Sequence, residues 1–408
     1  MMTDEVDEAD QDIAEEVLPE AVADAAVPIE LQKLFPWHKP RKQYIRRRQW
    51  IEHANRLIGR LIKGHSLVPG SNGGDEIRYL TLPGTDYLDV KMLAECCKAN
   101  GCSLTSTGFL AAGTGNPMKA RAEVRQDALI KAGHITDRSY TVWRQLEEVS
   151  STKSAAYADL RRRGPFHIVN IDACGSLALP SSSHDNRLVD AIHRIVEMQI
   201  HHCTTRWLLY ITVDVRKENL NKSTLESLTD AIRENASNSE EFKSQTISMF
   251  GVGDYTLEGV LTAASSDDGS KFLQLFSLGF AKWLLHLAES KLWGLKVHNS
   301  YYYSTAEADV ERPTMPCLVF EFVPPPMGLP DPYRVIRTEP AQGGSDEDFS
   351  MRALDKVGSM RDLDQIIACD DGLRRSLVSE TKELLEDVGY TATALSTLEE
   401  FSAALGAL

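Results

Sequence analysis

The 408-residue chain is 42% hydrophobic and 25% charged, a composition typical of a globular protein with a sizeable core. No apolar run approaches the roughly 20 residues that cross a bilayer, and the acidic first residues lack the positive region of a secretory signal. The seven cysteines form no CxxC pair. We therefore expect a cytoplasmic protein with reduced thiols in preference to a transmembrane or secreted one.

The net charge of −15 is distributed unevenly along the chain. Residues 1–27 contain ten acidic and no basic residues, which predicts a disordered acidic tail. Residues 331–408 contain sixteen acidic and eight basic residues, so the remaining part, 28–330, carries a charge of +3. The overall charge thus conceals a mildly basic central part, which is the part relevant to an anionic partner.

The segment 28–68 is predicted to be basic and helical. Ten Lys or Arg residues and a single acid, Glu52, lie between Lys33 and Lys63. An apolar stripe at helical spacing should dock on a core; it comprises Ile51, Ala54, Leu57, Ile58, Leu61 and Ile62. The basic residues mostly off this stripe are candidates for binding nucleic-acid phosphates, the alternative being a solvated face whose arginines pair with nearby acids. These candidates are Arg41, Lys42, Arg46, Arg47, Arg48 and Arg56.

Strand and helix signals alternate in the next part of the chain. Strands are predicted at 77–82 and 103–109, with a helix at 89–99 between them, and residues 118–160 read as helical. The glycine-rich loop at 111–117 lacks the lysine of a phosphate-binding loop.

The stretch from Phe166 to Ser176 is the most informative for function. Its first five residues are largely apolar and β-prone, as in a strand buried on both faces of a parallel sheet. The strand is followed by Asp172, Gly175 and Ser176. Ligands of open α/β sheets bind beyond the carboxyl ends of the strands. We expect these three residues to form a catalytic site; the alternative is that Asp172 caps a turn that Gly175 permits.

The rest of the chain continues the pattern and then changes it. A helix is predicted at 187–202 and another buried strand at 206–215, and helices are expected within 218–290. Two further strands, at 295–304 and 315–323, are separated by a loop short enough for them to pair antiparallel. We expect an α/β, Rossmann-like, mostly parallel sheet with a terminal antiparallel strand pair and helices on both faces, in a domain spanning 69–330. A linker at 331–350 should lead to a small, acidic, helical C-terminal appendage at 351–408, which either packs on the domain or binds a protein partner.

This order resembles the class I S-adenosylmethionine-dependent methyltransferase fold over residues 75–325. Segment 82–89 (Leu-Pro-Gly-Thr-Asp-Tyr-Leu-Asp) stands at the family's glycine-rich cofactor loop, with one glycine where the family usually has two or three. Residues 108–110 contain no acid, although the family has one there for the ribose hydroxyls. Residues 172–175 (Asp-Ala-Cys-Gly) are similar to the Asp-Pro-Phe-Gly of some tRNA guanine dimethyltransferases.

The resemblance implies S-adenosylmethionine as cofactor, with Gly84, Asp86 and Asp89 holding it. It also implies a nucleic-acid methyl acceptor oriented by Asp172. Structural roles stay open for Asp86 as a turn residue and for Asp89 as a helix N-cap. A catalytically degenerate domain serving as a binding subunit of a nucleic-acid-processing or defence assembly also stays open, as does an enzyme that uses another nucleotide.

A metal site is not expected from the sequence. The run His201-His202-Cys203 lies in a predicted helix, where adjacent side chains point to different sides and cannot all reach one ion.

Overall fold

A computed structural model describes residues 34–67, 74–111, 116–177, 188–251, 256–304, 313–325 and 346–399 of the protein. The predicted disordered tail at 1–27 and most of the predicted linker lie outside these ranges.

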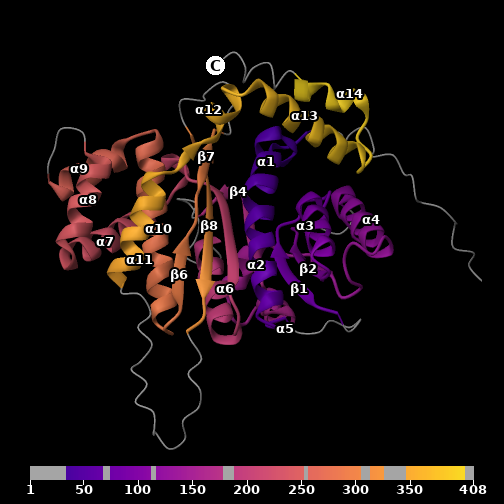
Figure 1. Cartoon of the computed structure of the whole chain (residues 1–408), viewed down its shortest axis with the longest axis horizontal. Coiled ribbons are helices and arrows are strands. Elements are labelled where there is room, and N and C mark those ends of the chain that lie inside the picture. The colour runs from indigo at the N-terminus through magenta and orange to yellow at the C-terminus, as the bar shows by residue number, and fades with distance from the viewer. Residues whose placement is uncertain are drawn as a thin grey trace, which may run out of the picture.

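One sheet organises the described residues (Figure 1). Its first five strands are β1 (Glu76–Thr81), β2 (Ser103–Phe109), β3 (Tyr140–Val142), β4 (Ile168–Ser176) and β5 (Trp207–Asp214). They run parallel in the order β3-β2-β1-β4-β5. β8 (Met315–Val323) pairs antiparallel with β5, and β6 (Gly294–Val297) and β7 (Tyr301–Tyr303) pair antiparallel with β8. A short β9 (Arg361–Asp362) extends the edge beside β7. The predicted α/β class and the terminal antiparallel strands are confirmed.

The central strands β5 and β8 are buried on both faces, as their apolar composition predicted. In β5 all eight residues are buried. Leu209 and Ile211 join the larger of two apolar cores, whereas Leu208 and Tyr210 join the core on the opposite face. This alternation follows from the period of two along a strand.

Helices cover both faces of the sheet. The larger core is closed by helices that follow β3 to β5 and by α11, and the second core by helices at the N-terminal side together with α12 and α13. The first group comprises η4 (Leu146–Ser150), α5 (Ala155–Arg163), α6 (Leu188–His202), α7 (Lys222–Asn238), α8 (Glu240–Phe250), α9 (Leu257–Ser266), α10 (Ser270–Glu289) and α11 (Asp346–Gly358). The second comprises α1 (Pro40–Ile45), η3 (Arg46–Ile51), α2 (Glu52–Lys63), α3 (Leu88–Ala99), α4 (Pro117–Lys131), α12 (Leu363–Ala368) and α13 (Asp371–Glu386).

The N-terminal helix lies on the sheet and is partly enclosed by the C-terminal helices. After a turn of 3-10 helix, η2 (Pro36–His38), α1 leads without a break into the π-helical η3 and then α2. The predicted apolar stripe of α2 is confirmed, since Ala54, Leu57, Ile58 and Leu61 are buried. All six residues of α1 are also buried, because α12 and α13 cover the side away from the sheet. The C-terminal helices, which end in α14 (Ala392–Leu395), therefore pack on the α/β domain.

Three local expectations differ from the structure. Residues 140–142 form a strand inside the stretch that read as helical, because a three-residue strand is too short to show a period. β4 runs through Gly175 and Ser176 with a register shift after Asp172, so the expected turn is instead an irregularity within the strand. The strand expected at 295–304 is divided into β6 and β7.

Candidate functional site

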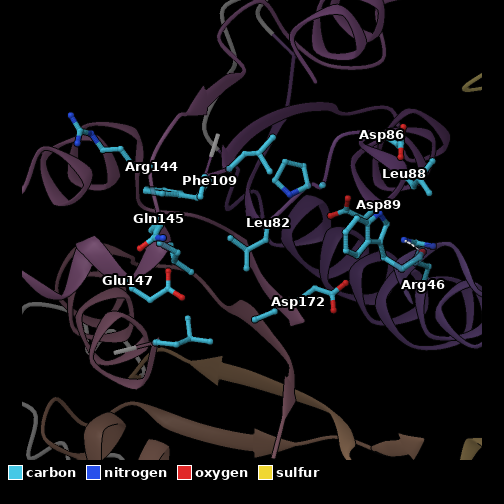
Figure 2. Close-up of a pocket in the computed structure, with 18 residues that line it drawn as sticks. Arg46, Leu82, Asp86, Leu88, Asp89, Phe109, Arg144, Gln145, Glu147 and Asp172 are labelled. Atoms are coloured by element: carbon cyan, nitrogen blue, oxygen red, sulfur yellow. Dashed lines mark hydrogen bonds between the residues drawn. The ribbon is translucent and has the colours of Figure 1, made fainter. Parts of the chain in front are cut away.

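A cavity of about 420 Å³ opens at the carboxyl ends of β1, β2 and β4. Its walls come from the loops after β1, β2 and β3, from the end of β4 and from the N-terminal helical segment. Figure 2 shows Arg46 and Asp89 at one end, Gln145 and Glu147 at the other, and Asp172 between them. This is the edge at which open α/β sheets bind ligands, and the volume suits a ligand of nucleoside size.

The loop after β1 forms one wall and brings Gly84, a predicted cofactor-binding residue, to the cavity. Gly84 has a φ of +60°, a backbone conformation that residues other than glycine rarely adopt. A Cβ placed on it would lie 3.6 Å from the Trp37 indole nitrogen, so the loop and the N-terminal segment pack closely. Gly84 and Trp37 both line the cavity.

Asp89 is turned into the protein instead of capping α3. The N-cap of α3 is Tyr87, so the N-cap alternative for Asp89 is wrong. Asp89 Oδ2 accepts hydrogen bonds from the hydroxyls of Tyr79 and Thr81, both at 2.7 Å. Burial, reinforced by the Asp89 charge, raises the pKa of Tyr79 well above its usual range, so this phenol remains a donor. Asp89 lines the cavity, and its Oδ1 accepts neither of these hydroxyls.

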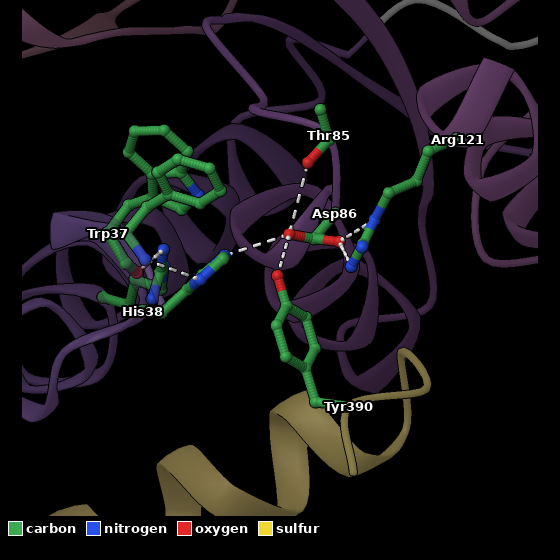
Figure 3. A network of polar contacts seen from close by, with 8 residues as sticks. Trp37, His38, Thr85, Asp86, Arg121 and Tyr390 are labelled. Atoms are coloured by element: carbon green, nitrogen blue, oxygen red, sulfur yellow. Dashed lines mark hydrogen bonds and ion pairs between the residues drawn. The ribbon is translucent and has the colours of Figure 1, made fainter. Parts of the chain in front are cut away.

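Asp86 ties four separate segments together (Figure 3). One carboxylate oxygen accepts from Arg121 Nε at 2.8 Å, and the other accepts from His38 Nε2 at 2.9 Å and more distantly from Tyr390. Contacts with His38 and Arg121 lower the pKa of Asp86 despite its burial. Both oxygens are thus engaged within the protein. Asp86 lines the cavity, but its contacts hold the N- and C-terminal segments against the β1 loop.

His38 in this network is held in its neutral form. Burial lowers its pKa more strongly than Asp86 raises it. Nδ1 accepts from the Phe35 backbone N–H at 3.2 Å, which assigns the ring proton to Nε2, where it is donated to Asp86.

Asp172 lines the cavity, whereas Gly175 and Ser176 do not. Asp172 Oδ1 forms an ion pair with the buried Lys42, whose ammonium also lies 4.8 Å from the centre of the Trp50 ring. The Ser176 hydroxyl donates to the Asn219 carbonyl. Of the three predicted catalytic residues, the structure therefore brings only Asp172 to the cavity.

The six basic candidates fall into two sets. Arg41, Lys42 and Arg46 are each at most 4% exposed, and Arg41 and Lys42 pair with Asp364 and Asp172. Arg47, Arg48 and Arg56 are exposed. Nothing in the sequence distinguished the sets, because the π-helical stretch changes the phase of the helix and distant C-terminal residues bury its first turns. A role in nucleic-acid binding stays a prediction and now depends on the exposed set.

Arg46 and Trp37 place buried donors at one end of the cavity. Arg46 Nη2 donates to the Trp37 carbonyl at 2.8 Å, but Arg46 Nε and Trp37 Nε1 are buried and have no hydrogen-bond partner among the residues that the structure describes. Burial lowers the pKa of Arg46. Sequence reasoning assigned Arg46 to a surface and did not place Trp37 in a pocket.

Residues after β3 form the other end of the cavity. The sequence analysis did not identify them as site residues because it did not predict β3. Arg144, Gln145 and Glu147 line the cavity there. Glu147 is half-buried and has no hydrogen bond or ion pair within the described ranges. The β-prone residues at 140–142, just before Trp143, were the sequence feature that could have predicted this strand.

Other chemistry-bearing groups lie away from the cavity. Within the described ranges, no three His, Cys, Asp or Glu side chains are placed to hold a metal ion. The six cysteines whose side chains are described are free thiols. None of the helices in those ranges is both long and apolar enough to span a membrane.

Comparisons with known proteins place the chain in a family. A solved structure, the StiE O-MT segment of residues 942–1257, is 10% identical and aligns over 74% of this chain and 80% of its own length. Its TM-score is 0.26, too low to support an argument. No curated protein matches the sequence. A family model described as PP_RS20740-like matches residues 31–400, which include both the cavity and the helices that enclose it. The chain therefore belongs to the PP_RS20740-like family.

Proposed function

We propose that this protein is an S-adenosylmethionine-dependent methyltransferase. The observation that carries the proposal is the cavity at the carboxyl ends of β1, β2 and β4, in a sheet whose parallel strands are followed by antiparallel ones. Its volume of about 420 Å³ suits a nucleoside with an amino-acid side chain. The polar groups of the cavity also suit such a ligand. One end has buried donors and carboxylates, and the other end has an amide and a carboxylate.

Three residues would hold the cofactor, one in the loop after β1, one in α3 and one in η4. The backbone at Gly84 would approach it closely, because no side chain intervenes. Asp89 would offer its remaining oxygen to an ammonium group. Glu147, after β3, would accept from the ribose hydroxyls in place of the acid that is missing after β2. S-adenosylmethionine, when bound, supplies an electrophilic methyl group.

Asp172 would orient the methyl acceptor. Lys42 neutralises one of its oxygens, and the other remains available to accept a hydrogen bond from an N–H or O–H of the acceptor. Methyl transfer needs the acceptor atom in line and about 3–3.5 Å from the methyl carbon. A fixed hydrogen-bond acceptor at the strand end provides this orientation without removing a proton before the transfer.

Calorimetric titration of S-adenosylmethionine and S-adenosylhomocysteine into the full chain tests this proposal. Ala111 lines the cavity and is exposed, so Ala111→Trp should fill the space with little effect on folding, whereas Ala111→Ser should leave it open. We expect micromolar binding by the wild type and the Ser variant and none by the Trp variant. Binding that survives in Ala111→Trp would move the ligand to another site.

We propose a nucleic acid as the methyl acceptor, contacted by the exposed part of the N-terminal helix. Arg47 and Arg56 form only half-exposed or exposed ion pairs, which nucleic-acid phosphates can replace. Reversing Arg47, Arg48 and Arg56 to Glu should abolish binding of a labelled RNA or DNA at low salt. A control variant reverses two lysines outside this helix, the exposed Lys222 on α7 and the partly exposed Lys243 on α8, and should bind like the wild type. Equal affinity of both variants would remove this surface from consideration.

A second candidate is a binding subunit without catalysis. The ion pair between Lys42 and Asp172 favours it, because the pair stabilises the N-terminal helix against β4 without any ligand. This candidate predicts no binding of either adenosyl compound by a protein that unfolds cooperatively. Capture of partners from native cells through the C-terminal helices would then be the next experiment.

A further inference from the structure

Two arginines share one buried glutamate at the amino edge of the sheet, where the parallel strands begin and which lies opposite the cavity. Glu321 of β8 pairs in register with Leu208, the second residue of β5. Its side chain is 1% exposed and accepts from Arg60 of α2 at 2.8 Å and from Arg206, immediately before β5, at 3.1 Å. Burial favours the neutral acid, but contacts with His298 and Arg60 lower the pKa of Glu321 to about 2, so it stays ionised. One negative charge therefore meets two guanidinium groups.

A second pair of arginines is arranged in the same way at the start of β1. The Glu76 side chain is 3% exposed, accepts from Arg78 Nε at 3.2 Å and also pairs with Arg138, two residues before β3. Because β4 and β5 lie between β1 and β8, the two glutamates are three strand spacings apart, about 14 Å in the plane of the sheet. The amino edge thus has two fixed sites, each with more cations than acids.

The four arginines are held by the protein and still face solvent. Their side chains are 32–50% exposed, and each reaches its glutamate through a single nitrogen. The other two guanidinium nitrogens of each arginine have no partner among the described residues. A guanidinium that is already oriented binds a phosphate at a lower cost in side-chain entropy than a free one does.

We propose that the amino edge of the sheet binds the phosphate groups of a nucleic acid, as a contact surface separate from the cavity. A B-form strand presents a phosphate about every 3.4 Å along its axis, so a strand can reach both sites, whereas one small anion can occupy only one of them. Arg56, 60% exposed and one helical turn before Arg60, connects this edge to the exposed arginines of the N-terminal helix. The inference rests on the proposed function for the class of partner and adds a path for it, along α2 to the amino edge.

An aromatic side chain at this edge favours a nucleic acid over an anionic membrane. Tyr140, the first residue of β3, is 41% exposed, and the Arg163 guanidinium lies 3.8 Å from the centre of its ring. An aromatic ring among arginines can stack on a base. Binding to a membrane surface needs a broad apolar face instead. The other large hydrophobic side chains that are exposed in the described ranges, Val124 and Leu292, lie on different elements and do not form one.

The test measures how salt changes the affinity of the full chain for a labelled DNA duplex. Two edge variants, Arg60→Gln/Arg78→Gln and Arg138→Gln/Arg206→Gln, each remove one arginine from each glutamate, so the remaining arginine keeps the buried acid paired. Each variant loses two phosphate contacts, so the slope of log K against log salt should decrease in magnitude by about 1.8. At 0.1 M salt the affinity should decrease by about 10- to 100-fold for the same reason.

A control variant makes the same charge change elsewhere. Arg194→Gln/Arg233→Gln removes two arginines whose side chains are 35% and 39% exposed and pair with acids on α6 and α7. It should keep the wild-type slope and affinity. Urea unfolding shows whether every variant is folded, and a purely structural role of the four edge arginines would change stability without changing the slope.

Three results would overturn the inference. Wild-type slopes in both edge variants would exclude this edge, and the N-terminal helix would remain as the proposed contact. Binding of the wild type to phosphatidylserine–phosphatidylcholine vesicles that both edge variants lose, with unchanged DNA binding, would assign the edge to a membrane surface. A folded wild type that binds neither DNA nor RNA would remove the proposed nucleic-acid partner together with this inference, which is a different result from binding with unchanged slopes.

Discussion

Replacing Asp86 by asparagine is expected to destabilise the protein strongly. The Asp86 side chain is 1% exposed and accepts from His38 and Arg121, whose side chains are 0% and 8% exposed. The substitution removes the charge and places an amide donor where His38 and Arg121 require an acceptor. Breaking a buried pair from one side costs about 3–5 kcal/mol, a large part of the 5–15 kcal/mol that holds a typical domain folded.

The assay is equilibrium unfolding in urea at pH 7, followed by circular dichroism. Asp387→Asn is the matched control, because Asp387 also pairs with a cation, Lys91, but is 49% exposed and should contribute no more than about 1 kcal/mol. The Asp86 variant should unfold at a markedly lower urea concentration with a similar slope. Midpoints that agree for the two variants would refute the assignment of Asp86 as the residue that holds the terminal segments.

Other outcomes follow from local geometry. Gly279→Ala in α10 should destabilise the protein by at least about 1–3 kcal/mol, because its Cβ would lie 2.6 Å from the Leu228 carbonyl oxygen of α7. Gly59→Ala in α2 should stabilise the protein by about 0.5–1 kcal/mol, because nothing lies within 4 Å of its Cβ. Urea unfolding of both variants checks that the two effects have opposite signs. Lys42→Met should cost about 3 kcal/mol in the same assay, since Asp172 loses its buried cation, and an unchanged midpoint would show that the pair contributes nothing. Burial lowers the pKa of His167 to about 4, so its contribution to stability is present above the unfolded-state pKa of about 6.5 and is lost below that pH at about 1.4 kcal/mol per pH unit. His167→Asn should therefore reduce the fall in melting temperature between pH 6.5 and 4.5. An identical pH dependence in the variant and the wild type would contradict this.

The sheet was predictable because its evidence is local. Runs such as 206–215 are apolar throughout, and a strand buried on both faces needs that composition wherever it lies. The apolar stripe of α2 and the helix 187–202 were predictable for a similar reason, since the spacing of apolar residues identifies an amphipathic helix. Asp172 could be placed at the cavity because it follows the apolar part of such a strand.

The roles of the charged residues were decided by contacts between distant parts of the chain. Arg41 is buried because it meets Asp364, 323 positions away, and Lys42 because it meets Asp172, 130 positions away. A sequence pattern reports the charge of a side chain and its position on a helix, but not the element that covers it. Asp86 likewise became a structural centre only when Tyr390 and His38 converged on it. The sequence by itself therefore determined the layers of the fold and pointed to four residues that line the cavity, Gly84, Asp86, Asp89 and Asp172. Tertiary packing decided which charges face solvent and which buried donors remain for a ligand, because burial and pairing depend on residues that only folding brings together.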